Sequence, residues 1–160
     1  MIPGIDRTRK HHAIEHATIA VLLERNRRPF SVLGRSDPGG FHLYSPFGPD
    51  EVESALGEAM ERLRGGEGHL AVTNNCGTNI VATGVLAGLA AVIGVGRGPD
   101  RNWPRAVVAA ILGTIAAAPA GRWIQRHLTT DVEIADVVFE STREYRRRGR
   151  LRHLRIALKD

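Results

Sequence analysis

The sequence is 160 residues long, enough for one domain with a hydrophobic core but short for two ordinary domains. Its 22 lysines and arginines outnumber its 17 aspartates and glutamates, which favours an anionic partner such as a lipid surface or nucleic acid. Cys76 is the only cysteine, so an internal disulfide framework is excluded.

The first part of the chain predicts a small polar α+β portion. It begins with a helix from near Thr8 to the residue before Pro29. The predicted elements that follow are a β-hairpin around 37–40, a helix that opens at Pro49 and is closed by Gly65 and Gly66, and a short strand at 69–73.

The first predicted helix carries an H-x-x-E-H pattern at His12, Glu15 and His16. At about 100° per residue these side chains fall in one sector, which continues into apolar residues, whereas His11 projects away from it. Two histidines at i and i+4 can bind one metal, and a neighbouring glutamate can act as a further ligand or activate a bound water. The alternative is a polar helix face whose histidines hydrogen-bond to the backbone.

Cys76 precedes the first long apolar run, in the stretch "NNCGTN". At a helix N-terminus the first-turn amides favour a thiolate, which is the form that binds metals. The alternative is a simple turn in which the cysteine fills a small space.

Two uncharged runs follow, Gly77–Gly96 and Ala106–Gly121. The first has about the 20 residues that a helix needs to cross a bilayer, and Trp103 and Trp123 flank the second as interfacial residues would. We therefore predict a two-helix transmembrane hairpin over residues 77–121. A pair of buried Ala/Gly-rich helices in a soluble protein is the alternative.

The predicted hairpin implies an orientation in the membrane and a kind of binding partner. Three of the basic residues, Arg97, Arg101 and Arg105, lie between the spans, and all others lie on the side of the termini. This asymmetry predicts a protein of the cell (inner) membrane with both termini cytoplasmic. The G-x-x-x-G pattern at Gly84 and Gly88 suits close packing of another membrane helix or a second copy of the chain.

The last segment, 122–160, predicts a strand and a basic tail. Apolar residues alternate at Val132, Ile134 and Val138. The tail from Arg143 to Lys159 favours binding to anionic lipid headgroups, with a merely solvated charged face as the alternative. The fold class is therefore α+β, a single unit with a polar portion at 1–76, the hairpin at 77–121 and the strand and tail at 122–160.

Four stretches of the sequence together resemble a bacterial family of small membrane proteins classed as a domain of unknown function. The stretches are "HHAIEHATI", "NCGTN", "GRSDPGGFHLY" and "RHLTTD", so the resemblance covers the chain from about Arg9 to Asp136. A second uncharacterised bacterial membrane family is similar more distantly, and it has lysine where this chain has Ala17. The residues that match both families are His12, Glu15, His16, Cys76, Gly77 and Thr78. The resemblance implies an architecture and a candidate site but no reaction.

Three functions are compatible with these patterns. In the first, His12, His16 and Cys76 bind Zn²⁺ and Glu15 is the general base of a hydrolase. In the second, the same four residues form a closed structural metal site in a non-catalytic protein. In the third, the chain is a metal-free membrane assembly protein. Nucleic-acid binding is not expected, because the sequence lacks an aromatic platform and a basic recognition helix.

Overall fold

The computed structural model describes residues 3–26, 30–73, 76–96 and 102–159. The chain forms two compact units, which are described separately: Met1–Val72 with Leu128–Asp160, and Thr73–His127. The predicted α+β class is confirmed, since helices and an antiparallel sheet are both present. Arg97 and Arg101, two of the three loop arginines used for the topology prediction, lie outside the described residues.

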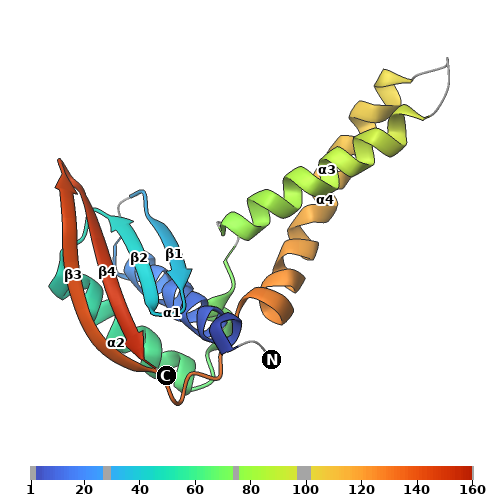
Figure 1. The fold of residues 1–160 in the computed structure, drawn as a ribbon. Coiled ribbons are helices and arrows are strands. Elements are labelled where there is room, and N and C mark those ends of the chain that lie inside the picture. Colours follow the sequence, from blue (N-terminus) through green and yellow to red (C-terminus); the bar gives the residue numbers. More distant parts are fainter. Residues whose placement is uncertain (1–2, 27–29, 74–75, 97–101, 160) are drawn as a thin grey trace. The chain divides into compact units, whose positions relative to one another are not determined.

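The first unit is a four-stranded antiparallel sheet in the order β1-β2-β4-β3, with α1 and α2 on one face (Figure 1). Its elements are α1 (Pro3–Arg25), β1 (Leu33–Asp37), β2 (Gly40–Ser45), α2 (Pro49–Arg64), η1 (Gly68–Ala71), β3 (Val138–Arg148) and β4 (Leu151–Lys159).

The core lies between the sheet and the two helices. Phe41 and Leu43 of β2 point inward opposite Ile156 and Leu154 of β4, and all four are fully buried. Alternate residues of a strand face opposite sides of the sheet, so the intervening side chains, such as His42, lie on the outer face. This alternation fixes the register, because a shift by one residue would expose every inward side chain.

The predicted helices and hairpin of the polar portion are confirmed. α1 begins five residues before the predicted start at Thr8, and α2 opens at Pro49 as expected. The β1–β2 turn is closed by the Gly39 amide, which donates to the Asp37 carboxylate at 2.8 Å. Gly40 has φ 131°, a conformation that L side chains rarely adopt.

One strand prediction is wrong, and a second strand begins later than predicted. Residues 68–71 form the 3₁₀ turn η1, where the Leu70 amide donates to the Glu67 carbonyl. A five-residue apolar run does not by itself distinguish a strand from a tight helical turn. The predicted strand with alternation at Val132 and Ile134 starts only at Val138, because turn hydrogen bonds such as that from the Glu133 amide to Asp131 shape the residues before it.

The predicted basic tail is the β3–β4 hairpin. Leu154, Ile156 and Leu158 alternate along β4 and are buried, while Arg155 and Ala157 occupy the positions between them. The tail therefore supplies a central strand of the sheet rather than an appended segment.

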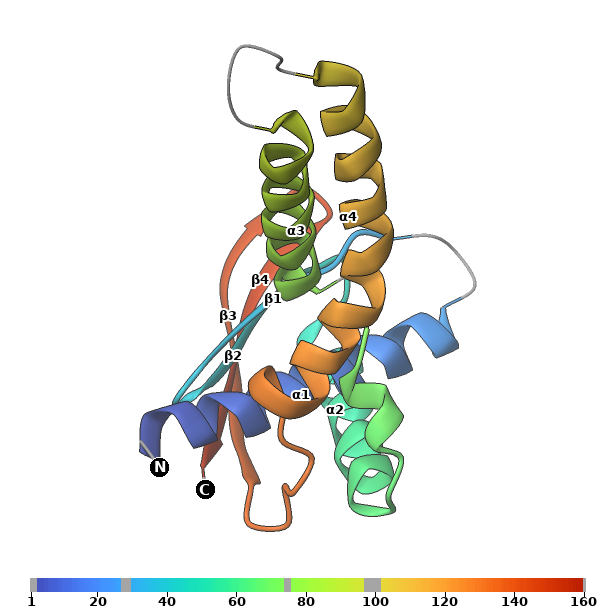
Figure 2. The same ribbon diagram turned by 90° about the vertical axis from the view of Figure 1, so that its right-hand side faces the viewer.

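The second unit is an antiparallel pair of helices, α3 (Gly77–Val95) and α4 (Trp103–Ile124), and a π-helical turn, Gln125–Thr129, follows α4 (Figure 2). A Cβ atom on Gly113 would lie 2.7 Å from the Leu86 carbonyl oxygen, so this glycine lets the two backbones approach closely. Nothing lies within 4 Å of a Cβ placed on Gly84 or Gly88, so the G-x-x-x-G pattern does not face α4.

Both helices of this unit are long and apolar enough to cross a membrane. The span Gly77–Val95 has a mean hydropathy of 1.9 and Trp103–Thr129 one of 1.6. Only 11% of the apolar 18-residue stretch in each span is buried, whereas the core helix of a soluble protein is mostly buried. Large apolar side chains such as Ile80 and Ile93 are exposed.

Candidate metal centre

α1 positions the two candidate histidines. Its apolar side chains, among them Ile14 and Ala17, are fully buried in the core. His12 and His16 lie one turn apart on the helix, and their ring centroids are 4.2 Å apart in an edge-to-face arrangement. His16 is 3% exposed and His12 is half-buried. The spacing predicted from the H-x-x-E-H pattern thus brings two imidazoles side by side.

Each imidazole is oriented by a backbone carbonyl. His12 Nδ1 donates to the Thr129 carbonyl at 2.9 Å, and His16 Nδ1 donates to the Ala71 carbonyl at 2.8 Å. A carbonyl can only accept, so Nδ1 carries the proton and the neutral ring has its lone pair at Nε2. Metal-binding histidines in proteins typically use one nitrogen for a carbonyl or carboxylate in this way and the other for the metal.

Cys76 is the N-cap residue of α3. Its carbonyl accepts the Asn79 amide at 2.9 Å, and the residue is 6% exposed. The preceding residues of the "NNCGTN" stretch, Asn74 and Asn75, lie outside the described residues. The position immediately before the helix is the one that the sequence predicts for this cysteine.

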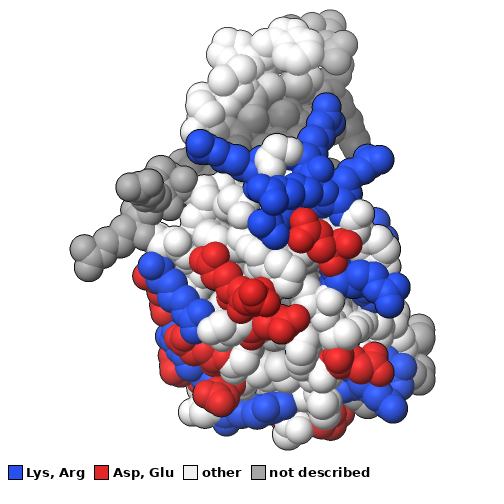
Figure 3. All heavy atoms as spheres, turned by 90° about the vertical axis from the view of Figure 1, so that its left-hand side faces the viewer, with Lys and Arg blue, Asp and Glu red and all other residues white. Residues whose placement is uncertain are grey.

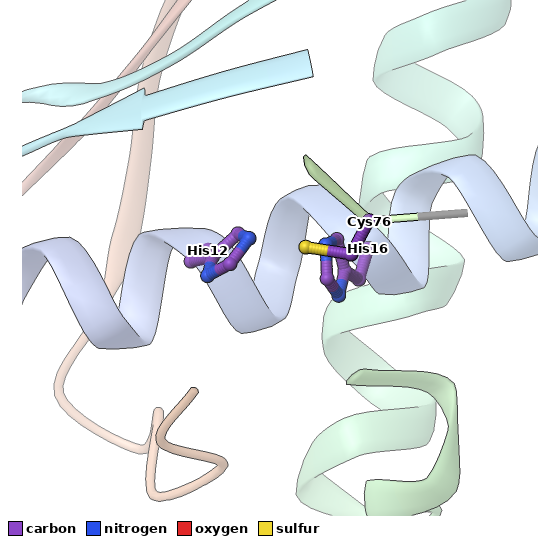
Figure 4. Close-up of side chains that lie close together, drawn as sticks. All are labelled: His12, His16 and Cys76. Carbon is purple, nitrogen blue, oxygen red and sulfur yellow. The ribbon is translucent and has the colours of Figure 1, made fainter. Parts of the chain in front are cut away.

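Three of the predicted site residues form a group that could hold a metal ion. The ligand atoms of His12, His16 and Cys76 all lie within 4.8 Å of one another (Figure 4). Two nitrogens and a sulfur around one tetrahedral zinc are separated by about 3.3 to 3.8 Å. The three side chains are therefore candidates for ligands of a common zinc ion.

Glu15 lies beside strand β1. Its carboxylate accepts a hydrogen bond from the Ser36 hydroxyl, and the side chain is 4% exposed. A Cβ atom on Gly34 would lie 2.0 Å from Glu15 Oε1, so this glycine makes room for the carboxylate. Among the described residues, the group of possible metal ligands contains His12, His16 and Cys76 without Glu15.

The other histidines near the sheet have different partners. His11 Nδ1 contacts the Asp37 carbonyl at 2.9 Å. On the outer face of the sheet, His42 Nδ1 lies 2.9 Å from His153 Nε2, and Tyr44 stacks on His153 at 4.3 Å. Burial and the positive charge of Arg155 lower the pKa of His42.

The sequence did not reveal the residues that hydrogen-bond to the two imidazoles and to Glu15 or pack against that carboxylate. Ala71 and Thr129 contribute carbonyl oxygens, which carry no sequence signal. Gly34 and Ser36 resemble ordinary hairpin residues until the fold places them against Glu15. The outer-face pair of His42 and His153 follows from the alternation in β4, which the basic composition of that segment obscured.

Comparison with known proteins places the chain among uncharacterised relatives. Residues 7–141 match the family model described as "Domain of unknown function (DUF6391)". An uncharacterized protein of Picosynechococcus sp. (strain ATCC 27264 / PCC 7002 / PR-6) is 33% identical over 147 residues, which cover 83% of this chain and 72% of that protein. No solved structure matches the chain.

Proposed function

The chain belongs to the DUF6391 family, a domain of unknown function, and we propose that it is an integral membrane protein with a zinc-dependent hydrolase centre. His12, His16 and Cys76 are the zinc ligands and Glu15 is the general base. The observation that carries this proposal is the group of His12, His16 and Cys76, whose possible ligand atoms lie within 4.8 Å of one another, together with the Nδ1 hydrogen bond that each imidazole donates to a backbone carbonyl.

The ligand set favours zinc over other ions. Imidazole nitrogens and a thiolate suit Zn²⁺, whereas Mg²⁺ and Ca²⁺ prefer oxygen ligands. Three protein ligands leave a fourth position for water, which zinc would make acidic enough to act as a nucleophile near neutral pH. The buried carboxylate of Glu15, held by the Ser36 hydroxyl, is the group that would accept the proton of that water.

Chain connectivity also supports Cys76 as the third ligand. His16 is hydrogen-bonded to Ala71, and Cys76 follows Ala71 by five residues. Five residues span at most about 17 Å, so the backbone of Cys76 cannot lie farther than this from the backbone of Ala71.

Membrane insertion is supported by the two apolar helices. A soluble protein would have to cover their exposed apolar side chains, and only 11% of the apolar 18-residue stretch in each span is buried. In a bilayer the same side chains contact lipid tails. We propose the inner membrane as the location, with both termini in the cytoplasm.

A non-catalytic protein with a structural zinc site is the second candidate. His16, Cys76 and Glu15 are all less than 7% exposed, and burial is typical of closed structural sites. In that case Glu15 is the fourth ligand and no position remains for water. A metal-free assembly protein, which docks a partner helix on the open face of Gly84 and Gly88, is the third candidate.

Cobalt substitution separates these candidates. Co²⁺-loaded protein in detergent should show a thiolate-to-cobalt charge-transfer band that disappears in Cys76→Ser. A zinc-binding hydroxamate should shift the cobalt spectrum if a coordination position is open. Glu15→Gln should retain the metal affinity of the wild type if Glu15 is a base.

The opposite results identify the other candidates. A spectrum that does not respond to hydroxamate, together with weakened metal binding in Glu15→Gln, would contradict the hydrolase and support the structural site. Absence of the charge-transfer band in the wild type would contradict both metal proposals.

A further inference from the structure

The far end of the β3–β4 hairpin carries a dense group of exposed arginines. Residues 143–152, here called the arginine tip, contain six arginines and one glutamate. Arg152 pairs with that glutamate, Glu144, at 3.1 Å. The remaining five are exposed and form no ion pair within the described part of the chain: Arg143, Arg146, Arg147, Arg148 and Arg150. Figure 3 shows Lys and Arg side chains gathered together on this side of the molecule.

Apolar and aromatic side chains lie among these arginines. Tyr145 is 58% exposed and Leu151 is 45% exposed. The strand pairing shifts register between Glu144 and Arg146, so Tyr145 sits at an irregularity of the ladder. Gly149, at φ 61°, forms the turn between the strands. Cations interleaved with an aromatic and an aliphatic side chain suit the boundary between lipid headgroups and acyl chains.

We infer that the arginine tip binds the headgroups of anionic phospholipids at a bilayer surface. The inference rests on the proposed membrane location. A guanidinium matches a phosphate with two parallel hydrogen bonds, so a cluster of five favours phosphate-bearing ligands. Each cation near an anionic surface raises the binding constant by about fivefold. The two apolar helices in the same chain favour lipid over nucleic acid.

Site-specific photocrosslinking of the full chain tests this inference. p-Benzoylphenylalanine replaces Tyr145, and the protein is incorporated into nanodiscs of phosphatidylcholine alone or of phosphatidylcholine mixed with phosphatidylglycerol. Irradiation should yield lipid adducts that mass spectrometry identifies as mainly phosphatidylglycerol. The probe placed at Leu33, which is exposed on β1 at the opposite edge of the sheet, should give few adducts.

Charge variants separate lipid binding from a structural effect. Replacing Arg146, Arg147 and Arg148 together by glutamine should lower the phosphatidylglycerol adduct about tenfold or more, whereas replacing them by lysine should largely retain it. Equal adduct yields with the glutamine variant, or loss of the lipid adduct when an oligonucleotide is added before irradiation, would overturn the inference. Failure of the chain to enter nanodiscs of either composition would overturn the membrane proposal and the inference with it.

Discussion

The two site histidines are held in one tautomer by atoms of the main chain. Because Ala71 and Thr129 contribute only carbonyl oxygens, substitution of their side chains leaves these hydrogen bonds in place. The orientation of the imidazoles therefore depends on where the backbone passes α1. The H-x-x-E-H spacing predicts that the rings are neighbours, and the fold determines which nitrogen of each ring carries the proton.

A substitution at Gly34 tests whether the Glu15 carboxylate packs against strand β1. In Gly34→Ala the added methyl would lie 2.0 Å from Glu15 Oε1, so the buried carboxylate must move. We expect the free energy of unfolding to fall by about 1 to 3 kcal/mol. Gly57→Ala is the matched control, because a Cβ there meets nothing within 4 Å in the middle of α2, and it should stabilise by about 0.5 to 1 kcal/mol. Chemical unfolding in detergent measures both, and an unchanged stability of Gly34→Ala would contradict the placement of Glu15.

The ionised carboxylate of Asp37 should stabilise the fold to an extent that depends on pH. Burial raises its pKa, but two hydrogen bonds from Arg155 at 2.8 Å, the Gly39 amide and the positive charge of Arg155 outweigh burial, so the net pKa is lowered. A lowered carboxyl pKa stabilises the fold above the unfolded-state value of about 3.9, and this stabilisation is lost as the pH falls through the folded-state pKa.

Asp37→Asn should therefore lower the free energy of unfolding by about 1 kcal/mol at neutral pH, allowing for partial exposure. The difference from the wild type should shrink as the pH falls below the unfolded-state pKa and disappear once Asp37 is protonated in the folded state. Denaturation curves of the full chain across this pH range provide the measurement. A difference that persists in acid would show that Asp37 stabilises the turn without its charge.

Among the secondary-structure elements, sequence periodicity predicted the helices better than the strands. α1, α2, α3 and α4 have long apolar patterns bounded by proline, glycine or charge, and all four are present. β4 was missed because its arginines obscured the alternation of buried residues. The strand at 69–73 was wrong because a short apolar run is ambiguous. Hydrogen-bonded turns before Val138 likewise depend on local contacts that hydrophobic alternation does not reveal.

The glycines of the helical pair differ in what they contact. Gly113→Ala places a methyl 2.7 Å from the Leu86 carbonyl oxygen and 2.9 Å from the Ala90 Cβ, so α3 and α4 must separate. We expect a loss of about 1 to 3 kcal/mol. Gly84→Ala, on the open face of α3, should be neutral or slightly stabilising. Thermal unfolding in detergent, followed by circular dichroism, compares them, and equal melting temperatures would contradict the packing.

For the whole molecule, composition indicated an anionic partner and apolar helices, but the arrangement of the candidate site was not predictable from spacing alone. Cys76 lies 60 residues from His16 in the sequence. The spacing also does not predict that η1 places the Ala71 carbonyl against His16. Zinc binding by His12, His16 and Cys76 stays a prediction, and the fold adds the carbonyl partners of the two imidazoles.

The topology proposal can be tested with single cysteines in a Cys76→Ala background. A cysteine at Asn102, beside the start of α4, should react with an impermeant maleimide added to intact cells, since we place the loop outside the cytoplasm. A cysteine at Ser141, exposed on β3, should react only after lysis. The reverse pattern would invert the topology, and equal labelling of both positions in intact cells would contradict a spanning hairpin.

The zinc content of the full chain, purified in detergent without chelator, tests the central claim most directly. We expect one zinc per chain in the wild type and in His69→Ala, which alters an exposed histidine in η1. His16→Ala and Cys76→Ala should fall to background while they retain the circular dichroism of the wild type. A wild type without zinc, or a His16→Ala variant that retains one zinc per chain, would contradict the metal centre.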